Sequence, residues 1–244
     1  MKQSLFEILS NEKIAPNVFK LKLKGDTSCI TTPGQFVNIK IDGTYLRRPI
    51  SVCDLEEDVL TLVYKVVGKG TEILSNLTFG KLDLLTGLGN GYNLNLSGYN
   101  PVLLGGGVGI PPLYLLCKKL LEQNKKPTVI LGFNKEEEIF LYDDFKKLGV
   151  EVIITTVDGS KGVKGFAVDG LENLDYSYFY TCGPELMLKS VYKNTKTQGQ
   201  LSFEERMGCG FGACMGCSCK TIYGNKRICK EGPVLLKEEI LWKD

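Results

Sequence analysis

The distribution of cysteines is the feature that most constrains this chain. It has nine cysteines in 244 residues, and five of them lie between Cys209 and Cys229. Cys209, Cys214 and Cys217 follow the spacing C-x4-C-x2-C, which is typical of plant-type [2Fe–2S] sites. The sequence contains no histidine, which excludes Rieske centres, Ser-His-Asp triads and the commoner zinc sites. The pattern therefore indicates metal binding before disulfide formation.

The residues after these three cysteines predict a fourth ligand. Residues 220–229 read as two short strands joined by the turn signal Gly-Asn at 224–225. This turn would bring Cys229 to the level of Cys219 and Lys220. A zinc site is the alternative, but zinc favours paired C-x2-C knuckles, and only one such pair is clean here. The predicted ligands are Cys209, Cys214, Cys217 and Cys229, with Cys219 as a neighbour.

The hydrophobic pattern divides the chain into three parts. Residues 1–97 carry short alternating or β-branched segments between turns, which predict an antiparallel β-barrel. One helix is expected after Gly70, with Thr71 as its N-cap. In residues 98–200, strands alternate with helices, which predicts a parallel-sheet α/β domain. Residues 201–244 predict a cysteine-rich loop, a hairpin and an acidic tail.

A glycine-rich turn opens the α/β part. The sequence LLGGGVGIPPL lies between a strand and a helix, where dinucleotide phosphates commonly bind, although close packing alone would also explain its glycines. No arginine follows the next strand and acidic residues do, which favours NAD over NADP. Strands are predicted at 101–104, 128–133, 152–156 and 178–181, and helices at 113–124 and 143–148.

Two further segments have both a plain and a functional interpretation. The sequence Cys182-Gly183-Pro184 ends a predicted parallel strand, where ligands bind, yet Cys182 could simply be a small core residue. In the barrel, Arg47 to Ser51 (RRPIS) and Val63 to Thr71 (VYKVVGKGT) offer an arginine, hydroxyls and a Gly-Thr pair for a diphosphate. Taken alone, surface arginines beside a turn are equally well explained without a ligand.

Taken together and in this order, the motifs resemble the ferredoxin–NADP reductase superfamily. The tail, with FEERMGCGFGACMGCSCK and RICKEGPVL, is more narrowly similar to the electron-transfer subunits of NAD-dependent dihydroorotate dehydrogenase B. The resemblance covers nearly the whole chain. The short gap between Cys217 and Cys229 departs from plant-type ferredoxins and fits the subunit family better.

The resemblance implies a role for each motif, and none of these residues is expected to act as a catalytic acid or base. Arg48 would contact the diphosphate of FAD and Ser51 would lie near the flavin ring. The full set of implied FAD contacts is Arg48, Pro49, Ile50, Ser51, Val63, Tyr64, Lys65, Gly70 and Thr71. The implied NAD contacts are Gly105, Gly106, Gly107, Gly109, Cys182, Gly183 and Pro184.

The resemblance also implies a partner. This would be an FMN-containing catalytic subunit in a heterotetramer of two plus two chains, which sends electrons through the cluster and FAD to NAD⁺ in pyrimidine biosynthesis. One alternative is a related reductase subunit that serves ferredoxin, sulfide or hydrogenase partners. Another is a non-catalytic zinc-binding or nucleotide-sensing module. The net charge of +2 and the absence of a long apolar run predict no nucleic acid, no membrane and a cytoplasmic location.

Overall fold

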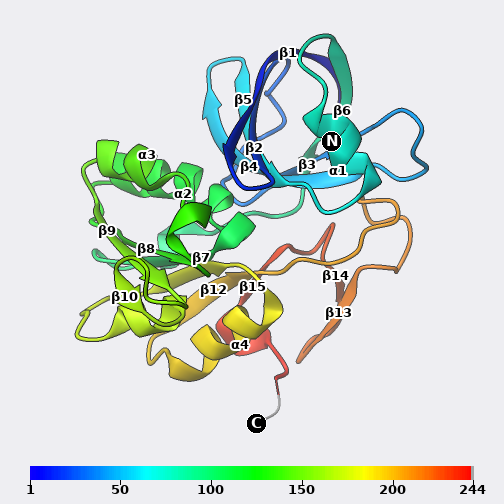
Figure 1. Cartoon of the computed structure of the whole chain (residues 1–244). Coiled ribbons are helices and arrows are strands. Elements are labelled where there is room, and N and C mark those ends of the chain that lie inside the picture. Colours follow the sequence, from blue (N-terminus) through cyan, green and yellow to red (C-terminus); the bar gives the residue numbers. More distant parts are fainter. Residues whose placement is uncertain (243–244) are drawn as a thin grey trace.

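The computed structural model describes residues 1–242, and the first part of the chain forms a closed antiparallel barrel (Figure 1). The strand order is β1-β2-β5-β4-β3-β6. In β2, Leu21 and Leu23 are buried while Lys22 and Lys24 are exposed, the period-two pattern of a strand with one face in the core. The barrel strands are β1 (Lys2–Ala15), β2 (Val18–Lys24), β3 (Phe36–Ile39), β4 (Arg48–Glu56), β5 (Val59–Lys65) and β6 (Lys81–Leu88).

Helix α1 (Lys69–Ser75) follows β5, and it corrects the predicted role of Thr71. Gly68 is the N-cap, and Thr71 is the third residue of the helix. The Thr71 hydroxyl accepts hydrogen bonds from the N–H groups of Val67 (2.9 Å) and Gly68 (3.3 Å). Because Gly68 has no side chain that can cap the helix, Thr71 reaches back and satisfies these N–H groups instead.

The second part is a seven-stranded sheet with the order β10-β9-β8-β7-β11-β12-β15. Neighbouring strands are parallel except for the last pair, in which β15 is antiparallel to β12. The six elements predicted in this part appear within two residues of their expected bounds, whereas β10, β12 and β15 were not predicted. The strands are β7 (Val102–Gly106), β8 (Thr128–Phe133), β9 (Glu151–Thr156), β10 (Val163–Lys164), β11 (Phe179–Cys182), β12 (Gly199–Ser202) and β15 (Val234–Leu236).

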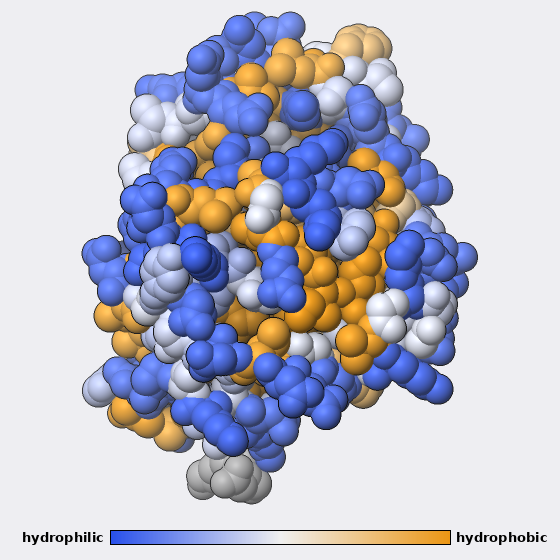
Figure 2. Space-filling model, turned by 90° about the vertical axis from the view of Figure 1, so that its left-hand side faces the viewer, coloured by the Kyte–Doolittle hydropathy of each residue, from blue (hydrophilic) through white to orange (hydrophobic). Residues whose placement is uncertain are grey.

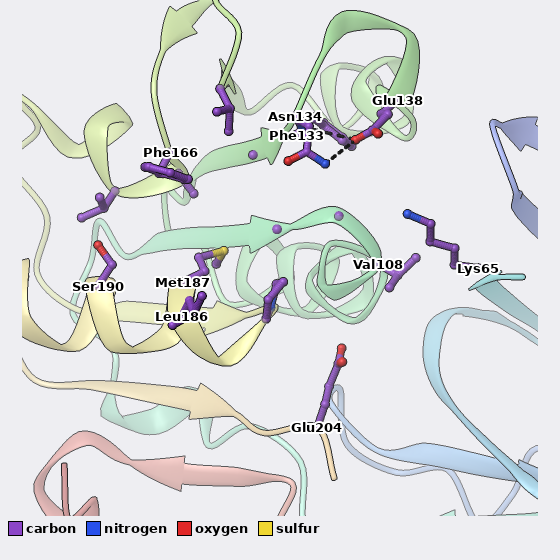
Figure 3. A pocket seen from close by; sticks show the side chains of 17 residues that line it. Lys65, Val108, Phe133, Asn134, Glu138, Phe166, Leu186, Met187, Ser190 and Glu204 are labelled. Carbon is purple, nitrogen blue, oxygen red and sulfur yellow. Dashed lines mark hydrogen bonds between the residues drawn. The ribbon is translucent and has the colours of Figure 1, made fainter. Parts of the chain in front are cut away.

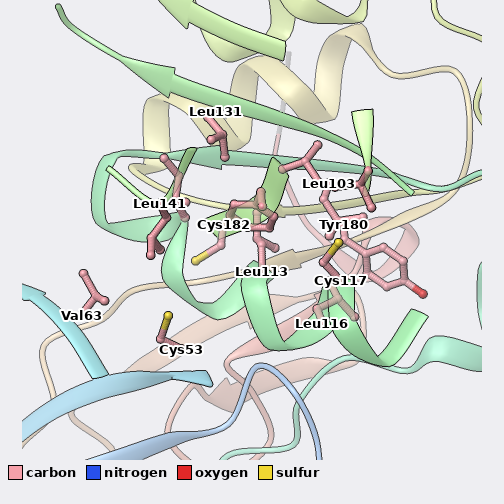
Figure 4. Close-up of a cluster of buried hydrophobic side chains, with 14 of the residues drawn as sticks. Cys53, Val63, Leu103, Leu113, Leu116, Cys117, Leu131, Leu141, Tyr180 and Cys182 are labelled. Carbon is pink, nitrogen blue, oxygen red and sulfur yellow. The ribbon is translucent and has the colours of Figure 1, made fainter. Parts of the chain in front are cut away.

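The helices of this part connect the sheet to the barrel. Buried Leu113 and Leu116 of α2 share one core with Cys53 and Val63 of the barrel (Figure 4). Lys118 of α2 also donates to the Asp54 carboxylate of the barrel at 2.7 Å. The α-helices are α2 (Pro111–Glu122), α3 (Tyr142–Lys147) and α4 (Glu185–Asn194); the 3₁₀ turns are η1 (Leu94–Leu96), η2 (Gly107–Gly109), η3 (Glu136–Glu138), η4 (Ala167–Leu171) and η5 (Lys237–Glu239).

The predicted C-terminal hairpin is present, but its register differs from the expected one. Strands β13 (Ser218–Thr221) and β14 (Gly224–Arg227) are joined by residues 222–223, so Gly224 and Asn225 belong to the second strand rather than to the turn. The pairing places Arg227 opposite Ser218, and Ile228 donates its N–H to the Cys217 carbonyl at 3.0 Å. Cys229 therefore returns beside Cys217 and not beside Cys219.

The surface and the helices add two observations. On the face shown in Figure 2, apolar side chains gather in a hollow near the middle, between mainly polar regions above and below. Among residues 1–242, no helix has both the length and the apolar character needed to cross a membrane.

Candidate functional site

A cavity of about 360 Å³ lies between β4 and β5 of the barrel and the carboxyl ends of β11 and β12 in the second sheet. Cys182, Ser202 and Phe203 line it from the sheet side. Of the nine residues assigned to FAD, all except Gly70 line this cavity: Arg48, Pro49, Ile50, Ser51, Val63, Tyr64, Lys65 and Thr71. Tyr64 has a structural role as well, because its side chain is buried in the barrel core and its hydroxyl lies 3.1 Å from Asn11 Oδ1.

The two adjacent arginines have different surroundings. Arg47 forms a bidentate pair with Asp83, at 3.0 and 3.1 Å, which lowers the pKa of that carboxyl. Arg48 instead lines the cavity and donates to the Leu46 carbonyl. Its guanidinium lies over Gly70, where a Cβ would come within 2.3 Å of Arg48 Nε. The absence of a side chain at Gly70 therefore makes room for the Arg48 guanidinium beside the cavity.

A second cavity, of about 570 Å³, opens where β7, β8 and β11 end (Figure 3). Among the residues assigned to NAD, Gly106, Gly107 and Pro184 line this cavity, and Cys182 lines the smaller one. Gly105, Gly109 and Gly183 line neither cavity.

The glycines outside the cavities permit close packing. A Cβ on Gly109 would lie 2.3 Å from the carbonyl oxygen of Cys182, so only glycine lets the turn rest on the Cys182 segment. A Cβ on Gly105 would lie 2.7 Å from Ile110 Cγ1. Because glycine has no Cβ, strand β7 can pack closely against the turn that leads into α2. Both residues act through the backbone.

Several residues of the larger cavity were missed by sequence reasoning. Asn134 follows β8, and its side-chain amide donates to the Glu138 carboxylate at 2.9 Å (Figure 3). Leu186, Met187 and Ser190 come from the first turns of α4. The only sequence signal for Asn134 and Glu138 was their position after the strand that follows the glycine turn, which is where a ribose would bind.

The two cavities meet at Lys65, Val108 and Glu204, which line both. In Figure 3 these three side chains lie at the same end of the larger cavity. Glu204 is exposed and lines both cavities, and partial desolvation by the protein atoms around it raises the pKa of its carboxyl. Burial likewise raises the pKa of the nearby Cys182 thiol far above its usual range.

The cysteine segment begins at the rim of the smaller cavity. Glu205 and Met207 line that cavity, and Cys209 follows two residues later. Asn38 of β3 donates to the Cys209 carbonyl at 3.3 Å, which attaches the segment to the barrel. A redox group in the smaller cavity and one held by the cysteines would therefore be close neighbours.

The four predicted ligands form two pairs. The Cys214 N–H lies 3.4 Å from Cys209 Sγ, and the Cys229 N–H lies 3.4 Å from Cys217 Sγ. The Cys219 thiol lies 3.8 Å from the Lys220 carbonyl, and burial raises the pKa of this thiol. Among residues 1–242, no three cysteine or acidic side chains are close enough together to form a single-metal site. The donor set is thus two thiol pairs, and two pairs match the four thiolates of a two-iron cluster.

The electrostatic surroundings of the two pairs differ. Partial burial opposes ionisation of Cys209, but the N–H groups of Cys214, Phe211 and Ala213 outweigh it and lower the pKa of its thiol to about 6. Burial and the neighbouring Cys217 thiol raise the pKa of Cys229 to about 12. Cys209 thus favours the thiolate, whereas Cys229 favours the neutral thiol.

The comparisons with known proteins agree with this geometry. Residues 204–241 match the family model described as the iron–sulfur cluster binding domain of dihydroorotate dehydrogenase B. The chain is 42% identical to the dihydroorotate dehydrogenase B (NAD(+)) electron transfer subunit of Fusobacterium nucleatum, over 94% of this chain and 95% of that protein. It is 39% identical to the subunit of Lysinibacillus sphaericus, over 97% and 98% of the two chains.

Solved structures show the same fold. An NADH-dependent reduced ferredoxin-NADP oxidoreductase structure matches with a TM-score of 0.88 and 31% identity, covering 98% of this chain and 90% of the other. A ferredoxin NADP+ reductase from Neisseria gonorrhoeae matches with a TM-score of 0.69 and 19% identity, covering 80% and 90%, and so supports the fold alone. Because its similarity to the curated subunits extends over nearly the whole length, the chain belongs to the family of electron transfer subunits of NAD-dependent dihydroorotate dehydrogenase B.

Proposed function

We propose that the chain holds FAD in the smaller cavity, NAD in the larger one and a [2Fe–2S] cluster on its four paired cysteines. In this role it passes electrons from the FMN of a catalytic subunit through the cluster and FAD to NAD⁺, in pyrimidine biosynthesis. One observation carries the proposal: the two cavities share Lys65, Val108 and Glu204, and the smaller one continues to Met207, two residues before Cys209.

For FAD, the proposal rests on Arg48 and its neighbours. The Arg48 guanidinium lies beside Gly70 and Thr71, so a diphosphate would meet a fixed positive charge there. Ser51 offers a hydroxyl deeper along β4. Arg47 is assigned a structural role in the barrel and no contact with FAD, since its guanidinium is paired with Asp83.

For NAD, the proposal rests on the ends of three strands. Gly106 ends β7 and Gly107 begins the turn η2 that leads into α2, so the main-chain N–H groups of this turn can face a pyrophosphate; α2 itself begins with two prolines, which have no N–H. The Glu138 carboxylate can accept hydrogen bonds from a ribose, and its charge would repel a 2′-phosphate. Phe166, Leu186 and Met187 add apolar surface for a ring.

For the cluster, the proposal assigns one iron to each cysteine pair. Cys209 and Cys214 would bind the outer iron, and Cys217 and Cys229 the buried one. The flavin, nicotinamide and cluster supply the electron chemistry, and the chain binds and orients them. No protein acid or base is needed for this, in keeping with a sequence that has no histidine.

The proposal includes the partner and the organisation of the chain. The partner is an FMN-containing dihydroorotate dehydrogenase catalytic subunit, joined in a heterotetramer of two plus two chains in the cytoplasm. Exposed Phe211, Met215 and Tyr223 around the cysteine segment offer it an apolar surface. The boundaries we propose are an FAD-binding domain at 1–97, an NAD-binding domain at 98–200 and a cluster-binding segment at 201–244.

A second candidate is a reductase subunit with a different partner. The 31% identity to the NADH-dependent reduced ferredoxin-NADP oxidoreductase structure favours it, because that protein has the same fold over 98% of this chain. Ferredoxin, sulfide or hydrogenase partners would then replace the dihydroorotate subunit. Affinity purification of the tagged chain from its own cells distinguishes the two candidates by the protein that accompanies it.

The cofactor content of the purified chain tests the proposal. We expect one FAD, two irons and two inorganic sulfides per chain, with a yellow-brown absorption spectrum that dithionite bleaches. The measurement combines flavin release, iron and sulfide assays and metal analysis. Stoichiometric zinc in a colourless protein without flavin would overturn the proposal and favour the zinc-binding alternative.

A further inference from the structure

Arg227, at the end of β14, connects three parts of the cysteine segment. Its Nη1 donates to the Gly212 carbonyl at 2.6 Å, in the loop between Cys209 and Cys214. Its Nε donates to the Glu231 carboxylate at 3.0 Å, and its Nη2 contacts the other oxygen of the same carboxylate. Glu231 also accepts the Arg227 main-chain N–H at 2.8 Å. This bidentate geometry holds the guanidinium in one orientation.

The bond to Gly212 affects both cysteine pairs. The Gly212 carbonyl and the Ala213 N–H belong to one peptide unit, and in a trans peptide they point in opposite directions. With Arg227 on the carbonyl side, the Ala213 N–H points away from the guanidinium and favours the charged form of Cys209, to whose sulfur the next N–H, that of Cys214, donates at 3.4 Å. The Gly212 N–H, in the preceding peptide unit, acts on the sulfur of Cys229. Arg227 thus fixes the short piece of backbone that supplies N–H groups to one sulfur of each pair.

The charge of Arg227 acts on the same site. Its guanidinium interacts electrostatically with the sulfurs of Cys217 and Cys229. The side chain is 24% exposed, so solvent screens it only in part. Arginine keeps its charge at every accessible pH, and Glu231 places a negative charge beside it.

We propose that Arg227 is a positioning residue for the [2Fe–2S] cluster, and that the Arg227–Glu231 pair sets the cluster's midpoint potential through contributions of opposite sign. The inference rests on the proposed function. Reduction adds one negative charge to the cluster, so a nearby positive charge stabilises the reduced form and raises the potential, while a nearby carboxylate lowers it. Arg227 is therefore expected to raise the potential, and Glu231 to reduce that effect.

The test is a redox titration of the cluster in the FAD-loaded chain, followed by electron paramagnetic resonance. In Arg227→Gln we expect a midpoint potential below that of the parent chain, and in Glu231→Gln one above it. Arg227→Lys should stay near the parent potential but lose iron faster on incubation with a chelator, because a lysine cannot hold Gly212 and both Glu231 oxygens in one plane. Lys220→Gln is the matched control: it removes an exposed charge from β13 and should shift the potential least.

A merely structural pair would give a different result. If Arg227 and Glu231 only held the loop together, both glutamine variants would shift the potential in the same direction or leave it unchanged, and either outcome overturns the inference. If Arg227→Gln fails to retain its cluster, the Glu231→Gln titration decides alone, and a potential that is equal to or below the parent value rejects the proposal. A parent chain with no [2Fe–2S] signal would instead refute the proposed function.

Discussion

The two cavities and the cysteine segment, residues 209–229, are built in different ways. The cavities lie between a closed barrel and a seven-stranded sheet that share a core, with Cys53 and Val63 of the barrel packed against Leu113 of α2. The cysteine segment contains only a hairpin of four-residue strands. It is held to the rest of the chain by buried Ile228, which shares a core with Leu201 and Leu235, and by polar contacts such as the pair formed by Lys226 and buried Glu239.

This difference separates two kinds of site. Packing of regular elements fixes the shape of the cavities, so they should persist without their ligands. The cysteine segment has little apolar core of its own, so bound iron should contribute much of its stability, as in small metal-binding domains. Substitutions in the two regions should therefore have separable effects on FAD and on the cluster.

The largest expected effect is at the buried cysteine pair. Cys229→Ser should lose the cluster while keeping FAD, because it removes the thiol that is paired with Cys217. Cys219→Ser is the control and should keep a near-normal signal, since that thiol contacts the Lys220 carbonyl and belongs to neither cysteine pair. Electron paramagnetic resonance and flavin absorbance measure both. An essential Cys219 with a dispensable Cys217 would show that the ligand assignment is wrong.

The next effect contrasts two adjacent arginines. Arg48→Ala should weaken FAD binding by about tenfold or more, since a hydrogen bond to a charged group contributes about 1.5–3 kcal/mol, and should leave the melting temperature of the apoprotein nearly unchanged. Arg47→Ala should leave FAD binding nearly unchanged and lower the melting temperature of the apoprotein, because it leaves the Asp83 carboxylate without its bidentate partner. Flavin titration and thermal denaturation distinguish them. Equal loss of FAD in both variants would contradict the separate roles.

A smaller effect is expected in the larger cavity. Glu138→Gln should lower the preference for NADH over NADPH by about tenfold, because it removes a charge that would repel a 2′-phosphate. Glu137→Gln, one residue away and paired with Lys135 outside the cavity, serves as the control. The ratio of kcat/KM for the two nucleotides with an artificial acceptor reports the change. A ratio altered equally in both variants would argue against a ribose contact at Glu138.

The smallest effect concerns Glu204. Because its surroundings raise the pKa of this carboxyl in the folded chain, Glu204 favours folding below its ordinary pKa, and that contribution is lost as pH rises through the raised value. Glu204→Gln should therefore melt slightly higher than the parent chain at pH 7, by on the order of 1 °C, and show no gain at pH 4. Thermal denaturation of the two chains at both pH values measures this. A lower melting temperature at pH 7 would contradict the assigned direction.

The sequence predicted features that depend on local pattern. Alternation in β2 and the buried run of β8 were sufficient to predict the barrel and the parallel sheet. Features that depend on distant partners were missed or wrong. The predicted turn at 224–225 was displaced by two residues, because Gly224 and Asn225 pair with β13.

Site prediction followed the same rule. The motif at Arg48–Ser51 lies at a cavity because its strand does, whereas Glu138 and Glu204 become cavity residues only when separate loops meet. Gly105 and Gly109 show a further limit, since their sequence pattern is the same whether a glycine faces a ligand or a neighbouring backbone. Sequence spacing selected the four cysteines as a group, but only the fold indicates which of them form pairs.

The most direct test of the central claim is an assay of dihydroorotate-dependent NADH formation by the purified chain, alone and with the proposed FMN-bearing catalytic subunit. The proposal assigns the two cavities to FAD and NAD and the paired cysteines to the cluster, and it assigns no residue of this chain to dihydroorotate. We therefore expect NADH-dependent reduction of artificial acceptors by the chain alone, no dihydroorotate oxidation, and NAD⁺-linked oxidation once the catalytic subunit is added. Dihydroorotate oxidation by the chain alone would contradict the account.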